Sequence, residues 1–157
     1  MSADTLELEN RITNMIYTFR DIKVMLDRDL AELYGVTTGN LNKAMKRNLD
    51  KFPDEFVFQL TREEAVDCLR FQNGSLKRGQ HIKYLPYVYS EYGVLMLSSV
   101  LNSKVAAEIN IKIIRVFVQL RKQLSMNPEY ALLREQMRKI EQEQNLLSYL
   151  KRSITKC

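Results

Sequence analysis

Apolar residues recur along the chain with two different periods, which predict short strands and amphipathic helices. Near the start, two runs of β-branched and aromatic residues flank the polar pair Arg20 and Asp21. This arrangement predicts a β-hairpin. The run at 56–60 predicts a further strand. The run at 82–89 predicts extended chain at a sheet edge, because it contains Pro86.

Capping residues and a glycine predict a closely spaced pair of helices after the hairpin. Asp27 is expected to cap a helix that ends at Gly35. Thr37 is expected to cap a second helix, which ends before Pro53. Ala31 supplies a small residue at the point where two helices cross. The spacing is typical of a helix-turn-helix, in which a glycine allows the tight turn.

Three further helices are expected in the rest of the globular part. Thr61 and Glu64 have the spacing of a capping box and start a short helix. Another helix begins at Ser90 and is apolar on most sides, so we expect it to be buried. The longest, from 104 to 124, carries a wide apolar stripe and is expected to be the spine of the core.

The composition changes at residues 125–127, where Asn127 and Pro128 are a typical N-cap and first-turn pair. Beyond them, apolar residues alternate spacings of three and four, which is the seam of a coiled coil. Polar residues at Gln144 and Lys151 interrupt this seam and are expected either to weaken it or to set its register or the number of helices that pair. The seam residues expected to hold a homodimer together are Leu133, Met137, Ile140 and Leu147.

These elements predict a mixed α+β fold. A helix-turn-helix is combined with small antiparallel β-hairpins and a C-terminal helical core, and a coiled-coil-like helix follows. The expected parts are a polar leader at 1–14, a globular domain at 15–125 and a helical tail at 126–157. A chain of 157 residues is long enough to bury one core without metals or disulfides.

Composition does not favour secretion, membrane insertion or metal binding. The first ten residues contain acids and no base, which does not fit a secretory signal. No stretch approaches the roughly 18 apolar residues of a membrane helix, so we expect a cytoplasmic protein with no membrane partner. Cys68 and Cys157 lie far apart without a nearby pair of histidines, so no metal site is expected.

The distribution of charge favours nucleic acid as the partner. The chain carries 24 Lys and Arg against 19 Asp and Glu, a net charge of +5, which attracts phosphate only where basic residues cluster. The second helix of the predicted pair is such a cluster, because no acid interrupts its outer face before Asp50. An asparagine there is suited to adenine, and lysine or arginine to guanine or phosphate. The residues expected to contact DNA are Thr37, Thr38, Asn42, Lys43, Lys46 and Arg47.

A second basic cluster lies in and after a loop that contains glycine and serine. Its members are Lys77, Arg78, His81 and Lys83. No acid occurs between Arg70 and Tyr89. A basic hairpin beside a recognition helix is how a winged domain reaches the neighbouring backbone or minor groove, so we expect this cluster to contact DNA as well. The alternative is a solvated loop.

Catalytic chemistry is not indicated. Asp27, Asp29 and Glu32 lie close together, as a metal-dependent nuclease requires, but capping and first-turn dipole effects already explain their positions. His81 is the lone histidine and has no sequence partner for nucleophilic work. We expect no catalytic residue, no cofactor and no small-molecule substrate.

The chain resembles the phage ORF-six N-terminal DNA-binding domain family, which is related to the KilA-N and Bro-N domains of phages and large DNA viruses. The resemblance covers about residues 15–124 and is carried by the segments IYTFRDIKVMLDRDLAELYGV, NLNKAMKRNLDKFPDEFVFQLT, YLPYVYSEYGVLMLSSVLNS and INIKIIRVFVQLR. It implies an N-terminal DNA-binding module of the kind found in phage antirepressors and regulators, followed by a variable C-terminal part. The individual DNA contacts named above rest on helix-turn-helix geometry and not on the resemblance.

The favoured hypothesis is therefore a sequence-specific, double-stranded DNA-binding regulator. Its second helix enters the major groove, and the tail pairs two copies so that they read two half-sites about one helical turn apart. The alternative is a protein-interaction module that binds a repressor and has little affinity for DNA.

Overall fold

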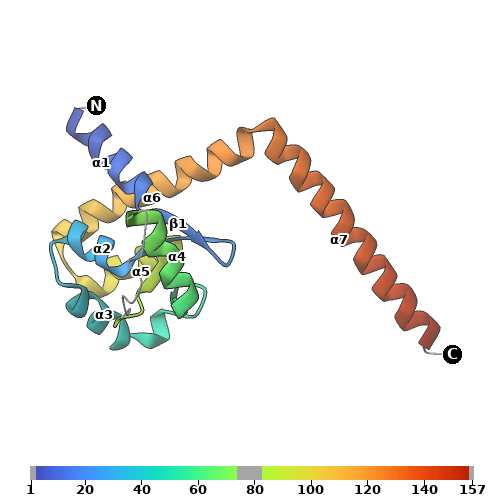
Figure 1. The fold of residues 1–157 in the computed structure, drawn as a ribbon, viewed down its shortest axis with the longest axis horizontal. Helices are drawn as coiled ribbons and strands as arrows, with labels where there is room; N and C mark the ends of the chain where they lie inside the picture. The colour runs from blue at the N-terminus through green and yellow to red at the C-terminus, as the bar shows by residue number, and fades with distance from the viewer. Residues whose placement is uncertain (1–2, 74–82, 156–157) are drawn as a thin grey trace. The chain divides into compact units, whose positions relative to one another are not determined.

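The computed structural model describes residues 3–73 and 83–155 of a mixed α+β protein, as the sequence predicts. Figure 1 follows the elements along the chain. In chain order they are α1 (Ala3–Asn14), β1 (Ile16–Phe19), β2 (Ile22–Leu26), α2 (Asp27–Tyr34), α3 (Thr38–Lys46), the 3-10 helix η1 (Leu49–Lys51), β3 (Val57–Gln59), α4 (Arg62–Asn73), β4 (Tyr87–Ser90), α5 (Glu91–Leu101), α6 (Lys104–Met126) and α7 (Pro128–Thr155).

The chain divides into two compact units, Met1–Phe117 and Val118–Cys157. The division falls inside α6, so the first unit holds the sheet and the other helices. The second unit holds the end of α6 and the whole of α7, which is one continuous helix of 28 residues.

The described strands form one antiparallel sheet in the order β1-β2-β4-β3. The first two strands are the predicted hairpin, and its turn residues Arg20 and Asp21 have φ angles of 53° and 62°. Positive φ at both central residues is typical of a type I′ turn, whose twist matches that of the paired strands.

The prediction that the chain near Pro86 lies at a sheet edge is wrong. Strand β4 lies in the interior of the sheet, between β2 and β3. Pro86 directly precedes this strand, so its missing N–H removes no hydrogen bond from the ladder. Its carbonyl oxygen accepts a hydrogen bond from the Leu60 N–H at 2.9 Å.

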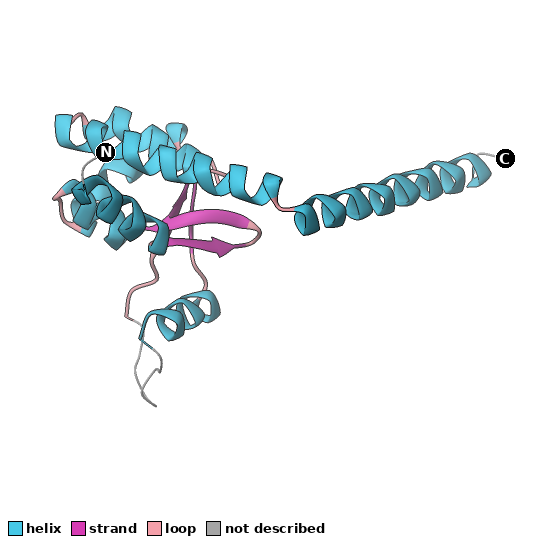
Figure 2. Cartoon of the chain, turned by 90° about the horizontal axis from the view of Figure 1, so that it is seen from above, coloured by secondary structure: helices cyan, strands magenta, loops and turns pink. Residues whose placement is uncertain are grey.

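Helix α4 covers one face of the sheet. Figure 2 shows it on one side of the strands, with the other helices of the first unit on the opposite side. The predicted capping box starts α4, because the Thr61 N–H donates to Glu64 Oε1 at 2.9 Å and the Glu64 N–H donates to Thr61 Oγ1 at 3.3 Å. Burial raises the pKa of the Cys68 thiol. The buried residues of this layer are Val24, Leu26, Leu60, Ala65, Cys68 and Val88.

The opposite face of the sheet is buried by α1, α2 and α3, which come before β4 in the sequence, and by α5 and α6, which follow it. Met25 and Tyr89 are directly paired on β2 and β4, so they share this face, and both are fully buried. The largest fully buried side chains that the helices contribute are Ile12, Leu30, Leu41, Met45, Leu97 and Ile113. The sheet is therefore the central layer of a three-layer unit.

Helix α5 begins against the backbone that leads into β3. The Ser90 side chain caps the helix by accepting from the Gly93 N–H at 3.4 Å, and it donates to the Glu55 carbonyl at 2.8 Å. A Cβ atom on Gly93 would lie 2.1 Å from the carbonyl oxygen of Phe56. Only glycine allows this close approach of helix and strand.

We expect Gly93→Ala to lower the free energy of unfolding by about 2 kcal/mol or more, because the added methyl group meets backbone that cannot yield without displacing β3. Urea unfolding followed by circular dichroism measures this change. Gly39→Ala is the matched control. The space around Gly39 is open, so this helical substitution is expected to be neutral or to stabilise by about 0.5–1 kcal/mol. An unchanged urea midpoint for Gly93→Ala would contradict the packing described.

Candidate nucleic-acid interface

Helices α2 and α3 are joined by a three-residue turn at 35–37. Gly35 adopts a left-handed φ of 71°, and the Val36 N–H donates to the Ala31 carbonyl at 3.0 Å. The predicted cap of the second helix is confirmed, because Thr37 Oγ1 accepts from the Asn40 N–H at 3.1 Å. Helix α3 ends at Lys46, earlier than predicted, and η1 follows it.

The carboxyl group of Asp27 is the polar centre of this helix pair. Asp27 is fully buried, and the backbone N–H of Arg28 donates to its Oδ1 at 2.8 Å. Its Oδ2 accepts from Asn42 Nδ2 at 2.8 Å, from the Tyr84 hydroxyl at 2.5 Å and from the Tyr87 N–H at 3.1 Å. Burying a carboxyl group is costly unless hydrogen bonds replace those of water, and these donors do so. They tie α2, α3 and the chain entering β4 together at one point.

The expected role of Asp27 as a helix cap is therefore wrong. Leu26 occupies the N-cap position of α2, and Asp27 is the first residue of the helix. Its side chain turns inward to long-range partners.

The prediction that Asn42 faces DNA is also wrong. Asn42 is 5% exposed, and its amide is fully engaged in the first unit. Its Nδ2 donates to Asp27 and to the Tyr84 hydroxyl at 2.6 Å, and its Oδ1 accepts from the Tyr89 hydroxyl at 2.9 Å. The physical reason is helical spacing. Asn42 lies three residues before the buried Met45, so both belong to the inner face of α3.

Asn40 is the exposed asparagine of α3, and the sequence interpretation missed it. Asn40, Lys43 and Arg47 follow one another at spacings of three and four, which places them along one face of the helix. The buried pair Leu41 and Met45 is the signal that could have identified this outer face from the sequence.

The remaining predicted residues of α3 form a basic surface. Lys43, Lys46 and Arg47 are exposed, as is the capping residue Thr37, whereas Thr38 is half-buried. The Lys46 ammonium lies 5.3 Å from the centre of the Tyr87 ring, within range of a cation–π contact. Helix α3 contains no acidic residue, so no neighbour on the helix itself neutralises these cations.

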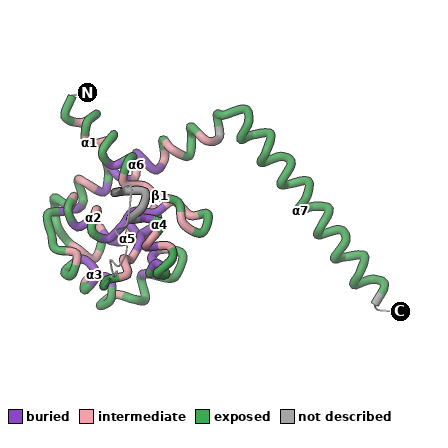
Figure 3. Tube along the Cα trace, in the orientation of Figure 1, coloured by how far each residue is buried: buried purple, intermediate pink, exposed green. Residues whose placement is uncertain are grey.

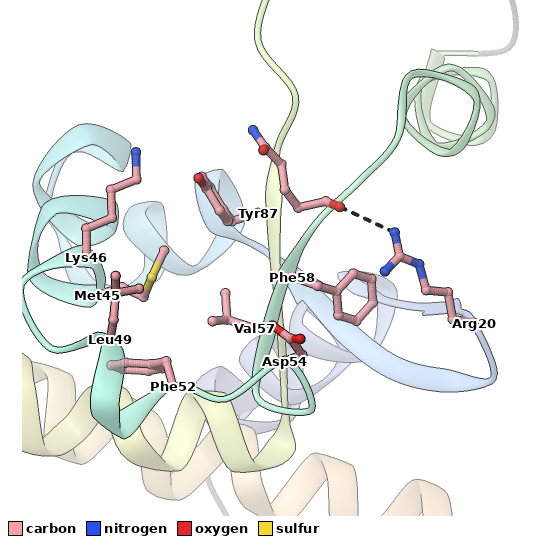
Figure 4. Close-up of a pocket in the computed structure, with 10 residues that line it drawn as sticks. Arg20, Met45, Lys46, Leu49, Phe52, Asp54, Val57, Phe58 and Tyr87 are labelled. Carbon is pink, nitrogen blue, oxygen red and sulfur yellow. Dashed lines mark hydrogen bonds between the residues drawn. The ribbon is translucent and has the colours of Figure 1, made fainter.

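An open groove of about 660 Å³ lies beside the C-terminal end of α3. Figure 4 shows Lys46 at one end and Arg20 at the other, with the side chain of Tyr87 between them. Arg20 is paired with Glu64 at 2.9 Å and also contacts the carbonyl oxygen of Gln59 at 3.4 Å. Lys46 is therefore the cation that the groove shares with the basic surface. The apolar lining comes from Met45, Leu49, Phe52, Val57 and Phe58.

The second predicted basic cluster lies largely outside the described residues, because Lys77, Arg78 and His81 are not among them. Lys83 is described and is exposed. It directly precedes Tyr84, whose hydroxyl is bound in the polar centre. Burial, reinforced by the hydrogen bond to Asp27, raises the pKa of Tyr84. Lys83, the last residue of the cluster, is thus next in sequence to a side chain that is bonded to Asn42 on α3.

The three acids considered for metal-dependent chemistry, Asp27, Asp29 and Glu32, each have different surroundings. Asp27 is occupied by its donors, and Glu32 pairs with Arg11 at 2.5 Å. Asp29 Oδ2 is buried without a hydrogen-bond partner, and burial raises the pKa of Asp29. Within residues 3–73 and 83–155, no group of three His, Cys, Asp or Glu is arranged to hold a metal ion. The same residues include no helix that is both long and apolar enough to span a membrane.

The residues predicted to hold a dimer lie on α7 and are all exposed. Their exposed fractions are 53% for Leu133, 61% for Met137, 54% for Ile140 and 59% for Leu147. Figure 3 shows the exposed surface continuing along α7. In this chain they form an apolar stripe that α7 presents to its surroundings.

Comparison with known proteins identifies one family. The ORF6N domain matches residues 14–100, which run from the end of α1 through the hairpin, the helix pair and the sheet to α5. This range is shorter than the span of about 15–124 inferred from the sequence and leaves out α6 and α7. No curated protein and no solved structure matches the chain.

The two asparagines of α3 should respond differently to alanine substitution. Asn42→Ala removes one of the donors to the buried Asp27 carboxyl group and the acceptor of the Tyr89 hydroxyl, so we expect a loss of about 2–3 kcal/mol in the free energy of unfolding. Asn40→Ala alters an exposed side chain and is expected to stay within about 0.5 kcal/mol. Urea unfolding of both variants measures the difference. Equal midpoints would show that Asn42 is not buried in this network.

Proposed function

The chain belongs to the ORF6N domain family, and from this membership we propose that it is a phage-type regulatory protein that binds double-stranded DNA in a sequence-specific manner. In this proposal α2 and α3 act as a helix-turn-helix, with α3 as the helix that enters the major groove. The observation that carries it is the outer face of α3, where Asn40, Lys43 and Arg47 are exposed together.

These side chains suit the chemistry of a base edge and its flanking phosphates. The amide of Asn40 can pair with adenine, and Lys43 and Arg47 can donate to guanine or to phosphate oxygens. Lys46 stands beside them and completes a cationic rim that attracts the sugar-phosphate backbone. Asn40 takes the role that the sequence interpretation gave to Asn42.

The buried network supports this proposal because it fixes the position of the α3 backbone in the first unit. Asn42 holds the inner side of α3 to Asp27 on α2 and to Tyr89 on β4. Groups that are already in place pay little ordering entropy when DNA arrives. The basic residues Lys77, Arg78, His81 and Lys83 are proposed as a second contact to DNA, and Tyr84, which follows Lys83, is bonded to Asn42 on α3.

The proposal includes a homodimer formed through α7. One nine-residue helix reaches few base pairs, so two copies reading two half-sites would raise both affinity and selectivity. The exposed apolar stripe of α7 supports this part of the proposal.

A protein-interaction module that binds a repressor is the second candidate. The groove beside α3 favours it, because its lining is largely apolar and Leu49 is 62% exposed at its rim. Such a groove suits an apolar segment of a partner protein. This candidate predicts weak DNA binding that does not depend on sequence.

The double variant Lys43→Ala with Arg47→Ala tests the proposal. Loss of two contacts to bases or phosphates is expected to weaken binding by on the order of 100-fold, and each lost phosphate contact should reduce the salt slope by about one. Fluorescence anisotropy measures binding to random duplex DNA from about 50 to 200 mM salt, and then to a sequence selected from a random library. Circular dichroism checks that the variant stays folded.

The matched control is Lys104→Ala with Arg115→Ala, which removes the same two charges from exposed positions on α6. We expect its affinity to stay within about threefold of the parent chain, since general attraction to phosphate changes little at this salt. Equal losses in the two double variants would mean that net charge, and not α3, drives binding. No binding even at the lowest salt would overturn the DNA proposal in favour of the protein-interaction module.

A further inference from the structure

Helix α7 presents exposed apolar residues from Tyr130 to Ile154, and Gln144 and Lys151 interrupt their seam. Its 28 residues make four heptads, a length of about 42 Å and enough for a stable coiled coil. In heptad terms, Tyr130, Met137, Gln144 and Lys151 take the a positions, and Leu133, Ile140, Leu147 and Ile154 take the d positions. The apolar members are all at least 46% exposed in the single chain.

We propose that two copies of α7 pair parallel and in register. This inference rests on the homodimer proposed above and specifies how its two chains are aligned. The alternative is an antiparallel pair, in which a positions of one helix face d positions of the other. The polar seam residues and the flanking charges distinguish the two alignments.

Gln144, one of the two polar seam residues, favours the parallel pair. In register, Gln144 faces Gln144 of the second copy, and two facing amides can hydrogen-bond to each other. In the antiparallel pair that matches all four heptads, Gln144 faces Ile140, and this mismatch occurs twice by symmetry. A polar amide buried against an apolar side chain loses its bonds to water without replacement.

The charged residues beside the seam favour the same alignment. Residues at g of one helix lie near the next e position of a parallel partner. This brings Glu129 close to Arg134 of the second copy, again twice by symmetry. In the antiparallel pair, Glu141 would face its own copy, and so would Glu143. Like charges at facing positions disfavour that alignment.

Lys151 is the one seam residue that works against the parallel pair, because it faces its own copy. Its position near the C-terminal end of α7 moderates the repulsion. A cation is favoured at that end of a helix, and the long lysine stem can lie along the seam while the ammonium group reaches water. In the antiparallel pair the two lysines are apart, but each ammonium group faces Leu133 in an apolar layer, which carries a desolvation cost of its own.

Parallel pairing has a consequence for DNA reading. The N-terminal end of α7 follows directly on α6 and the first unit. In a parallel pair both first units are attached at the same end of the coiled coil. Two copies of α3 are then available to one stretch of duplex, as a site with two-fold symmetry requires.

Disulfide exchange on the full chain tests the alignment. The background variant Cys157→Ser removes the terminal thiol, and the buried Cys68 is retained. Leu133→Cys and Lys151→Cys are made separately, with tags of different mass, and mixed under a glutathione buffer. The parallel pair predicts that each variant cross-links to itself and that mixed products are minor. A dominant mixed product would overturn the parallel alignment, because only the antiparallel pair brings 133 next to 151.

A charge exchange provides a second test that needs no cysteine. Glu129→Lys places two cations together in the parallel pair and is expected to raise the dimer Kd roughly 2- to 10-fold. Adding Arg134→Glu should restore the parent value. No rescue in the double variant would count against the predicted contact. Analytical ultracentrifugation measures the Kd values.

Light scattering separates this inference from the proposed function. A mass of two chains, together with self-cross-linking, supports the parallel pair whether or not DNA binds. A mass of one chain or of three chains overturns it. The anisotropy measurement on Lys43→Ala with Arg47→Ala reports on α3 alone, so a failure of DNA reading is recognised independently.

Discussion

The first unit depends on one buried carboxyl group and the donors that surround it. Asp27 has no access to water, and each hydrogen bond that it accepts comes from inside the unit. An unpaired carboxyl group in this position would cost several kcal/mol, so any rearrangement that removes a donor is strongly disfavoured. The partner Asn42 lies on α3, and the partner Tyr84 lies in the chain that leads into β4. Their relative positions are therefore set by the same atom.

A second polar contact holds α2 from its other end. The Tyr34 hydroxyl bonds to the Asn110 side chain on α6, and the Asn110 amide donates to the Val94 carbonyl on α5 at 3.0 Å. Burial raises the pKa of Tyr34, as expected for a phenol removed from water. With Asp27 at its start and Tyr34 at its end, α2 is fixed to the core at both ends. Helix α3 is held to α2 and to β4 through Asn42, and the flanking apolar residues fill the space between these polar points.

The separation of inner and outer faces of α3 connects this framework to function. On the inner face of α3, both the nitrogen and the oxygen of the Asn42 amide form hydrogen bonds within the first unit. The polar side chains available on the outer face are therefore those of Asn40, Lys43 and Arg47. A rigid helix that presents an amide and several cations is suited to a DNA groove. The groove beside Lys46 offers a different kind of surface, apolar and open. Lys46 belongs to both surfaces, so DNA and a partner protein are both candidate ligands of this region. Lys43 and Arg47 do not line the groove, so variants of these two residues test DNA binding without altering the groove.

Features that depend on neighbours a few residues apart could be predicted from the sequence. The turn at Arg20 and Asp21, the cap at Thr37 and the α+β fold class all followed from local spacing, because caps, turns and helical faces are set within about one turn of chain. The role of Asn42 could not be predicted in this way, because it depends on contacts between distant parts of the chain. Its partner Tyr84 lies 42 residues away, and Tyr89 lies 47 residues away on a strand that proved to be central. Whether a polar side chain faces solvent or a buried carboxyl group depends on contacts across such distances, and local pattern does not carry that information.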